Sequence, residues 1–99
     1  MKINQKLNGT SLLISLDGRL DTTTAPELEA VLKEALEGIT SLTLDFNNLV
    51  YISSAGLRVI LSTQKRMAKQ GSMKIINTNQ DVKDVFDMTG FSDIITIEK

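Results

Sequence analysis

The sequence contains neither cysteine nor histidine. The lack of cysteine excludes disulfides and thiol chemistry. The joint lack of both residues excludes Cys/His zinc sites, Ser–His and Cys–His catalytic pairs, and the side chain that most often acts as an acid or base at neutral pH. A serine without a neighbouring base is a poor nucleophile, so the composition predicts a protein that is not an enzyme.

Sequence motifs for catalysis and nucleotide binding are also missing. There is no Walker loop, no Gly-x-Ser-x-Gly and no Ser-x-x-Lys, since Ser53 is followed three residues later by Gly56 and Ser54 by Leu57. We therefore expect no cofactor. Aromatic residues make up only 4% of the chain, and no pocket-forming insert is evident, which argues against a small-ligand sensor.

An excess of one charge and a long apolar run are missing too. A net charge of -1 gives no electrostatic basis for binding nucleic acid. No apolar run approaches the roughly 20 residues of a membrane helix, and the N-terminus lacks a signal-peptide core. These absences predict a cytoplasmic, soluble protein without membrane insertion or direct nucleic-acid binding.

What the sequence does contain is an alternation of apolar patterns with two periods. Apolar residues at every second position predict strands, and those at helical spacing predict helices. The predicted order is strand, strand, helix, strand, helix, strand, helix, strand. This order favours an α/β fold with a mostly parallel mixed sheet, an antiparallel N-terminal strand and about three to four packed helices. We expect one domain over residues 1–99.

The element boundaries are predicted from caps, glycines and turn residues. The strands are expected at 2–7, Ser11–Leu16, Leu42–Phe46, Met73–Asn77 and Ile94–Ile97. The helices are expected to begin at Thr24, at the Ser53–Ser54 pair and at Val82, and to end at Gly38, Gly71 and Gly90. Turns are expected at Asn8–Gly9, Asp17–Gly18 and Asn47–Asn48, with a capping box from Thr24 to Glu27. The buried stripe of the second helix is predicted to include Leu57, Ile60, Leu61 and Ala68.

The stretch from Ser53 to Gly56 stands where a predicted strand passes into a helix. Either Ser53 or Ser54 is a natural N-cap, whose side-chain oxygen accepts from a first-turn N–H. The plain interpretation is a helix cap beside small residues. The alternative is a modifiable serine, because phosphorylation adds about −1.5 to −2 charge and a helix N-terminus favours an anion. The fold then survives, while a docked partner meets a bulky dianion.

Two charged residues are expected near this junction. Asp21 follows the second predicted strand, and loops leaving neighbouring strands converge at one sheet edge, although its plain role is a turn. Arg58 comes one helical turn after Ser54, where it can contact a partner or pair with phosphate. Asp17, Asp21 and Asp45 could together hold Mg²⁺, but nothing in their spacing requires it, so no metal site is predicted.

Three motifs follow one another at compatible spacings. They are Gly18-Arg19-Leu20-Asp21, then Leu44-Asp45 with Tyr51-Ile52-Ser53-Ser54-Ala55-Gly56-Leu57, and finally Val85-Phe86-Asp87-Met88-Thr89-Gly90-Phe91. Together they resemble the STAS domain of bacterial anti-sigma factor antagonists, and the resemblance covers nearly the whole chain.

The resemblance implies a protein that binds an anti-sigma factor serine kinase and so releases the sigma factor. The kinase uses ATP to phosphorylate a serine at the start of the helix, which ends the association, and a PP2C-type phosphatase restores the unmodified form. Ser54 takes the modified position. The family motif has an aspartate before this serine, whereas here Ser53 stands in its place. Asp21 matches the acidic residue of the neighbouring loop.

The surface expected to bind the partner surrounds Ser54. It comprises Asp21, Thr22, Ser53, Ala55, Gly56, Leu57 and Arg58. The alternative is a constitutive scaffold, or a subunit of a transporter, ABC complex or sensory assembly. In that case Ser54 is only a helix cap, and the helix surface is a permanent interface.

Overall fold

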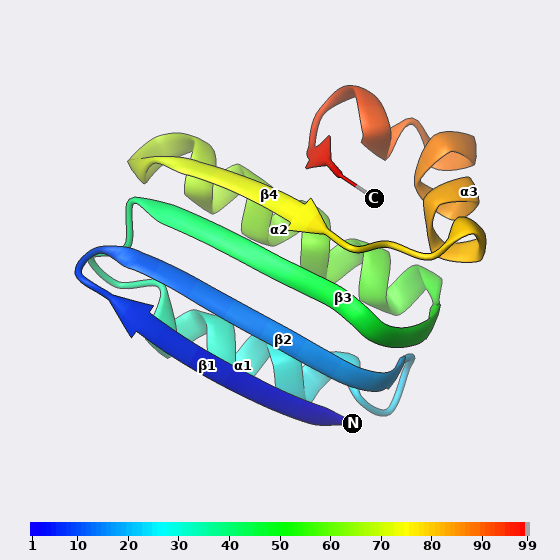
Figure 1. Cartoon of the computed structure of the whole chain (residues 1–99), viewed down its shortest axis with the longest axis horizontal. Helices are drawn as coiled ribbons and strands as arrows, with labels where there is room; N and C mark the ends of the chain where they lie inside the picture. Colours follow the sequence, from blue (N-terminus) through cyan, green and yellow to red (C-terminus); the bar gives the residue numbers. More distant parts are fainter. Residues whose placement is uncertain (99) are drawn as a thin grey trace.

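The computed structural model describes residues 1–98, and Lys99, the last residue of the predicted domain, lies outside the described residues. Its elements follow the predicted order (Figure 1). They are β1 (Lys2–Asn8), β2 (Ser11–Leu20), α1 (Ala25–Ala35), β3 (Ser41–Ile52), α2 (Ser54–Gln70), β4 (Ser72–Ile76), α3 (Gln80–Thr89), the 3₁₀-helix η1 (Phe91–Asp93) and β5 (Thr96–Ile97). The predicted α/β fold class is confirmed.

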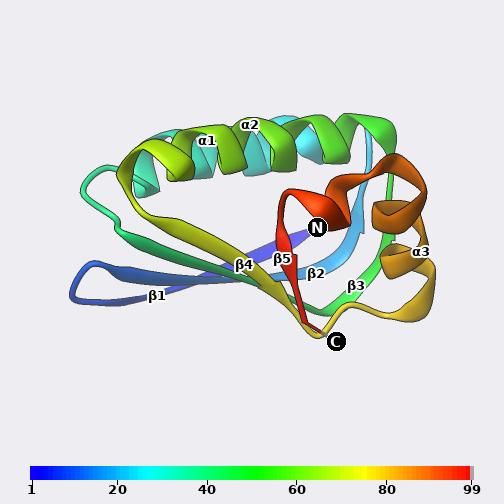
Figure 2. The same cartoon turned by 90° about the horizontal axis from the view of Figure 1, so that it is seen from above.

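The five strands form one sheet in the order β1-β2-β3-β4-β5. β1 pairs antiparallel with β2, and the other three pairs are parallel, which confirms the predicted antiparallel entry. Parallel neighbours need a crossover connection. α1 and α2 provide two of these crossovers, and both lie on the same face of the sheet (Figure 2).

The hydrophobic core lies between this sheet face and the two helices. Every second residue in the first halves of β2 and β3 points into it, and α1 contributes one residue per turn. The buried residues of these three elements include Leu12, Ile14, Leu16, Leu42, Leu44, Phe46, Leu28 and Leu32, and Leu36, the C-cap of α1, is buried with them. Each such side chain contributes roughly 1.5–3 kcal/mol when fully buried, so the packing of the helices against the sheet dominates the stability of the fold.

The buried stripe of α2 differs from the prediction. Leu57 and Ile60 are buried as expected, whereas Leu61 is only half-buried. Ala68 is exposed, and Met67 is fully buried in its place. The stripe also passes through Thr63, whose hydroxyl donates to the Val59 carbonyl oxygen over 2.8 Å. That local hydrogen bond satisfies the hydroxyl, so a residue counted as polar packs inside the core.

Both central strands run past the residues expected to end them. β2 continues through Asp17–Gly18, where Gly18 adopts φ 116°, a backbone conformation that favours glycine. β3 continues through Asn47–Asn48. The pairing passes from Ser15↔Asp45 to Asp17↔Asn48, so β3 carries one extra residue there and the irregularity is a bulge, not a turn.

The last predicted strand is shorter than expected. Residues Phe91–Asp93 form η1, and Ile94 is its C-cap, which leaves only Thr96–Ile97 in β5. These two residues pair with Lys74 and Ile75 of β4. Ile94 and Ile95, the first half of the predicted strand, form the turn that leads from η1 into β5.

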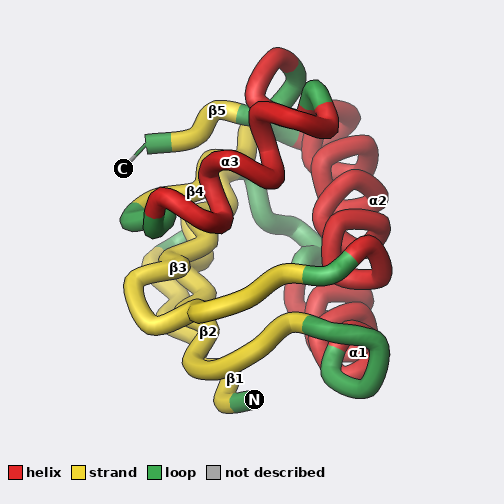
Figure 3. Tube along the Cα trace, turned by 90° about the vertical axis from the view of Figure 1, so that its right-hand side faces the viewer, coloured by secondary structure: helices red, strands yellow, loops and turns green. Residues whose placement is uncertain are grey.

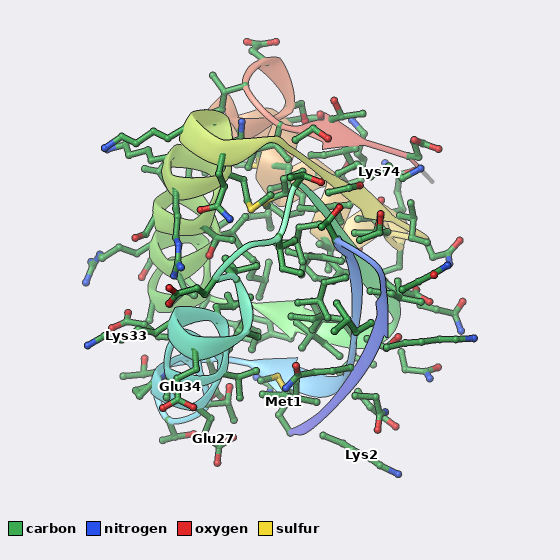
Figure 4. All side chains as sticks on the ribbon, turned by 90° about the vertical axis from the view of Figure 1, so that its left-hand side faces the viewer. Met1, Lys2, Glu27, Lys33, Glu34 and Lys74 are labelled. Atoms are coloured by element: carbon green, nitrogen blue, oxygen red, sulfur yellow. The ribbon has the colours of Figure 1, made fainter. Side chains whose placement is uncertain are left out.

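The sheet face turned away from α1 and α2 is not covered by a helix (Figure 2). Figure 4 shows Lys2 and Lys74 extending from strands on this side, whereas Lys33 extends from the helical side. The alternation of β2 and β3 places small and polar residues such as Ser15 and Thr43 on the same uncovered face. Within residues 1–98, no helix combines the length and the apolar character that crossing a membrane requires.

Candidate functional site

The carboxyl ends of β2 and β3 lie side by side at one edge of the sheet, where the chain turns into α1 and α2 (Figure 3). Leu20 and Ile52 are register partners at this edge. The backbone N–H of Ser53 donates to the carbonyl oxygen of Leu20 over 2.9 Å. The loop that begins at Asp21 therefore lies beside the start of α2, although the two are far apart in sequence.

Ser53 and Ser54 play different parts at the start of α2. Ser53 is the N-cap, with an extended backbone, and its side chain accepts from the Gly56 N–H over 3.4 Å. Ser54 is the first helical residue and is exposed. Among the described residues the Ser54 hydroxyl has no hydrogen-bond partner, so its oxygen faces solvent while its neighbour does the capping.

Gly56 and Leu57 lie beneath this surface. Both are buried, and Leu57 is only 9% exposed. A Cβ at Gly56 would come within 2.7 Å of the Leu20 side chain and 3.0 Å of the Ile52 side chain. The missing side chain lets α2 approach the strand ends closely, so these two residues shape the predicted partner surface from below and do not form its outer layer.

Asp21 organises the loop beside Ser53. Its Oδ1 accepts hydrogen bonds from the Thr23 hydroxyl over 2.8 Å, the Thr23 N–H over 3.0 Å and the Thr24 N–H over 3.2 Å. The Thr23 hydroxyl is the main cause that holds the pKa of Asp21 below its usual value. The backbone N–H groups of Thr24 and Thr23 act in the same direction, while burial opposes them. The carboxylate is therefore charged at neutral pH, and the turn role of Asp21 is confirmed.

The capping box predicted from Thr24 to Glu27 does not form. Thr24 occupies the N-cap position of α1, but its side chain makes no capping hydrogen bond. Its hydroxyl accepts from the Asp21 N–H over 2.8 Å and donates to the Arg19 carbonyl oxygen over 2.8 Å. The threonine thus ties the loop to the end of β2 instead of capping the helix.

A hollow of about 180 Å³ lies between the starts of α1 and α2. Thr22, Ala55 and Arg58, three of the residues predicted to bind a partner, line it together. The other lining residues are Ala25, Pro26, Glu29 and Val59. The structure therefore brings predicted residues from two distant parts of the chain to one surface next to Ser54.

Three residues at this edge were not predicted as site residues. The Arg19 guanidinium lies 4.3 Å from the centre of the Tyr51 ring and 3.9 Å from Asp21 Oδ2. Val50 and Tyr51 are 61% and 41% exposed, and both line a hollow of about 230 Å³ beside α3. The signal in the sequence is the break in alternation, because Leu49, Val50, Tyr51 and Ile52 form four consecutive apolar residues.

The three acids weighed as Mg²⁺ ligands do not come together. Asp17 and Asp45 lie within β2 and β3, and Asp21 lies in the loop beyond β2. Asp45 Oδ1 accepts from the Asn47 N–H over 2.9 Å and from Asn77 Nδ2 over 3.0 Å. No cluster of three acidic side chains suited to a metal occurs within residues 1–98.

Proteins of known sequence and structure resemble this chain over nearly its full length. The anti-sigma-B factor antagonist of Bacillus subtilis is 32% identical over 98 residues, covering 98% of this chain and 90% of the relative. An anti-sigma factor antagonist from Mycobacterium paratuberculosis has a TM-score of 0.90 at 17% identity, covering 98% of this chain and 84% of that one.

A second solved structure is that of the anti-sigma factor antagonist SpoIIAA in its unphosphorylated form. It superposes with a TM-score of 0.79 at 18% identity, covering 99% of this chain and 88% of that one. At this identity the likeness establishes the shared fold. The family model described as the STAS domain matches residues 2–99. By its sequence, its relatives and its fold, the chain belongs to the STAS domain family.

Proposed function

We propose that the protein is an anti-sigma factor antagonist whose partner binding is switched off by phosphorylation of Ser54. In the unmodified form it binds an anti-sigma factor that is also a serine kinase, and the sigma factor is released. The protein is the substrate of that kinase in the cytoplasm, and a PP2C-type phosphatase returns it to the binding form. The similarity to anti-sigma factor antagonists supports this function.

The observation that carries the proposal is the exposed Ser54 side chain. Ser54 is the first residue of α2, and the capping task belongs to Ser53. In the phosphoryl transfer, the Ser54 oxygen forms a bond to the γ-phosphorus of ATP, ADP leaves, and the hydroxyl proton passes to a base of the kinase. Because Ser54 does not hold the helix together, this reaction requires no change in the fold.

The effect of the phosphate on binding follows from charge and hydration. The new group carries about −1.5 to −2 charge and sits next to the surface formed by the Asp21 loop, Ala55 and Arg58. A partner that fits the neutral serine must now desolvate a dianion and accept its bulk. A penalty of about 3 kcal/mol weakens such a complex roughly a hundredfold.

The position of the phosphate is tested by mass. Incubation with the cognate kinase and ATP should add one phosphate to the wild-type protein and to Ser53→Ala, and none to Ser54→Ala. Retention of the phosphate in Ser54→Ala together with its loss in Ser53→Ala would reassign the acceptor to Ser53.

The switch itself is tested with a charge mimic. Ser54→Asp should unfold at the same urea concentration as the wild type or at a slightly higher one, because the side chain is exposed and a helix N-terminus favours an acid. It should bind the kinase far more weakly. An unfolded Ser54→Asp would show that the position is structural, whereas tight binding by this variant and no phosphate under any condition would favour the constitutive scaffold.

A further inference from the structure

Arg58 lies one turn after Ser54 on the same face of α2. Residues four apart on a helix have Cβ atoms about 5–6 Å apart, so their side chains are neighbours. Both Ser54 and Arg58 are exposed, and α2 is helical from Ser54 onward. The Arg58 side chain is therefore long enough to place its guanidinium beside any group attached to the Ser54 oxygen.

The guanidinium of Arg58 is also uncommitted. Within residues 1–98 it makes no ion pair or hydrogen bond, whereas Arg19 lies against the Tyr51 ring and Arg66 donates to the Lys33 carbonyl oxygen over 3.1 Å. Glu29 lines the same hollow as Arg58, yet no ion pair joins the two. The first turn of α2 contains no acidic residue either. Nothing in this part of the chain has to be displaced before Arg58 takes up an anion.

We propose that Arg58 pairs with the phosphate carried by Ser54 and thereby makes the phosphorylated form a distinct, ordered state of the domain. The inference rests on the proposed function. A guanidinium presents two parallel N–H groups to two phosphate oxygens, a geometry that an ammonium group does not offer. The pair forms by side-chain rotation alone, with the backbone of α2 in place.

The pairing adds a second component to the switch. Arg58 lines the hollow with Thr22 and Ala55, where in the unmodified protein its charge is available to an acidic group on the partner. Once the phosphate is present, the same guanidinium is held by Ser54. The partner then loses a cationic contact at the moment when it meets the dianion.

The test measures the protonation of the phosphate itself. Phosphoserine is incorporated at position 54 during protein synthesis, so that no kinase is needed, and the second pKa of the phosphate is followed by ³¹P NMR. The free group titrates at about pH 6. A paired guanidinium favours the dianion, so the phosphate of the wild type should titrate about 0.2–0.4 pH units below that of the Arg58→Gln variant.

Lys65→Gln is the matched control. Lys65 is an exposed cation on the same helix, and eleven residues of helix place it on the order of 16 Å from Ser54 along the axis, beyond the screening length of about 8–10 Å. Its variant should titrate like the wild type. Equal phosphate pKa values in the wild type and Arg58→Gln would overturn the pairing, as would an equal shift in Lys65→Gln.

A second readout separates this pairing from a purely structural role of Arg58. Without phosphate, Arg58→Gln and the wild type should unfold at the same urea concentration. With phosphoserine at position 54, the wild type should be the more stable of the two, and an unchanged difference would overturn the pairing. Failure of the kinase to modify Ser54 would reject the proposed function but would not alter these titrations, so the two failures are distinguishable.

Discussion

α2 and α3 both begin with an N-cap residue of extended backbone that follows a strand, yet their first turns differ. Asn79 accepts from the Val82 N–H over 2.8 Å, and Asp81 adds an acid to the first turn of α3. Ser53 accepts from the Gly56 N–H over the longer distance of 3.4 Å, and α2 has no acid in its first turn.

The difference shows two ways of completing the positive end of a helix. In α3 the chain itself supplies the amide cap and the negative charge that the helix dipole favours. In α2 the chain supplies a weak cap, Ser53, and the next residue, Ser54, carries an exposed hydroxyl. The start of α2 is therefore the one of these two helix ends that gains by receiving an anion.

The largest change in stability is expected at Gly56, a buried residue in the first turn of α2. Gly→Ala in a helix is ordinarily stabilising, by about 1 kcal/mol. Here the new Cβ would lie 2.7 Å from the Leu20 side chain, so we expect Gly56→Ala to lose about 1–3 kcal/mol of unfolding free energy in urea denaturation. Ser54→Ala, on the exposed face of the same turn, should stay within about 0.5 kcal/mol of the wild type. A Gly56→Ala protein as stable as the wild type would show that α2 can move outward without loss.

The next largest effect compares the two caps directly. Asn79 accepts from the Val82 N–H and also donates its Nδ2 to the Leu49 carbonyl oxygen over 3.1 Å. Asn79→Ala removes both hydrogen bonds and should lower the unfolding free energy by about 1–2 kcal/mol, whereas Ser53→Ala should lower it by about 0.5 kcal/mol. Equal losses in the two variants, measured by urea denaturation, would contradict the ranking of the caps.

A gain in stability, in contrast to the losses above, is expected at Thr78, just before the α3 cap. Its side chain is 6% exposed, and its hydroxyl oxygen has no hydrogen-bond partner within residues 1–98. Thr78→Val keeps the shape and removes the unsatisfied group, so it should raise the unfolding free energy by about 1 kcal/mol. A loss of stability in thermal or urea unfolding would show that the hydroxyl is satisfied in solution.

The smallest expected effect concerns the Asp21 loop, which lies next to the start of α2. The Thr23 hydroxyl holds the pKa of Asp21 below its usual value, so the carboxylate stabilises the fold above the pKa of the unfolded chain. That contribution is lost as the pH falls through the lower pKa of the folded state. The stability difference between the wild type and Asp21→Asn should therefore shrink on acidification, as followed by urea midpoints at several pH values. A stability difference that grows in acid would contradict a stabilising role of the Asp21 carboxylate.

Most of the fold was predictable because the two apolar periods are clear in the sequence. The alternation in β2 and β3 and the leucines of α1 depend only on which face each residue occupies. The bulge near Asn47 and the buried Thr63 were not predictable in this way. Each depends on a partner that the local pattern does not contain: the register of β2 in the first case and a carbonyl group one turn earlier in the second.

In the candidate site, too, the features set by neighbouring residues were predictable and those set by distant residues were not. The exposed serine at the start of α2 was predicted because capping chemistry is local, although the sequence left open which of Ser53 and Ser54 was the cap. The stacking of Arg19 on Tyr51 requires β2 and β3 to be paired, because the two residues face each other in the register. The Thr24 hydroxyl donates to the Arg19 carbonyl oxygen, a contact made by the turn at the end of β2. Local propensity favoured a capping box at Thr24, and the loop geometry set by Asp21 overrode it.

The central place of β3 has a consequence for how the domain folds. Its neighbours β2 and β4 both pair with it in parallel, so neither pair can form by simple hairpin closure, and each must wait for a crossover helix. The Asp21 loop meets Ser53 only when the first of these long-range pairs is complete. A nascent or unfolded chain therefore offers Ser54 without its surroundings. Under the proposed function, a kinase that recognises those surroundings would act only on molecules in which β2 and β3 have already paired.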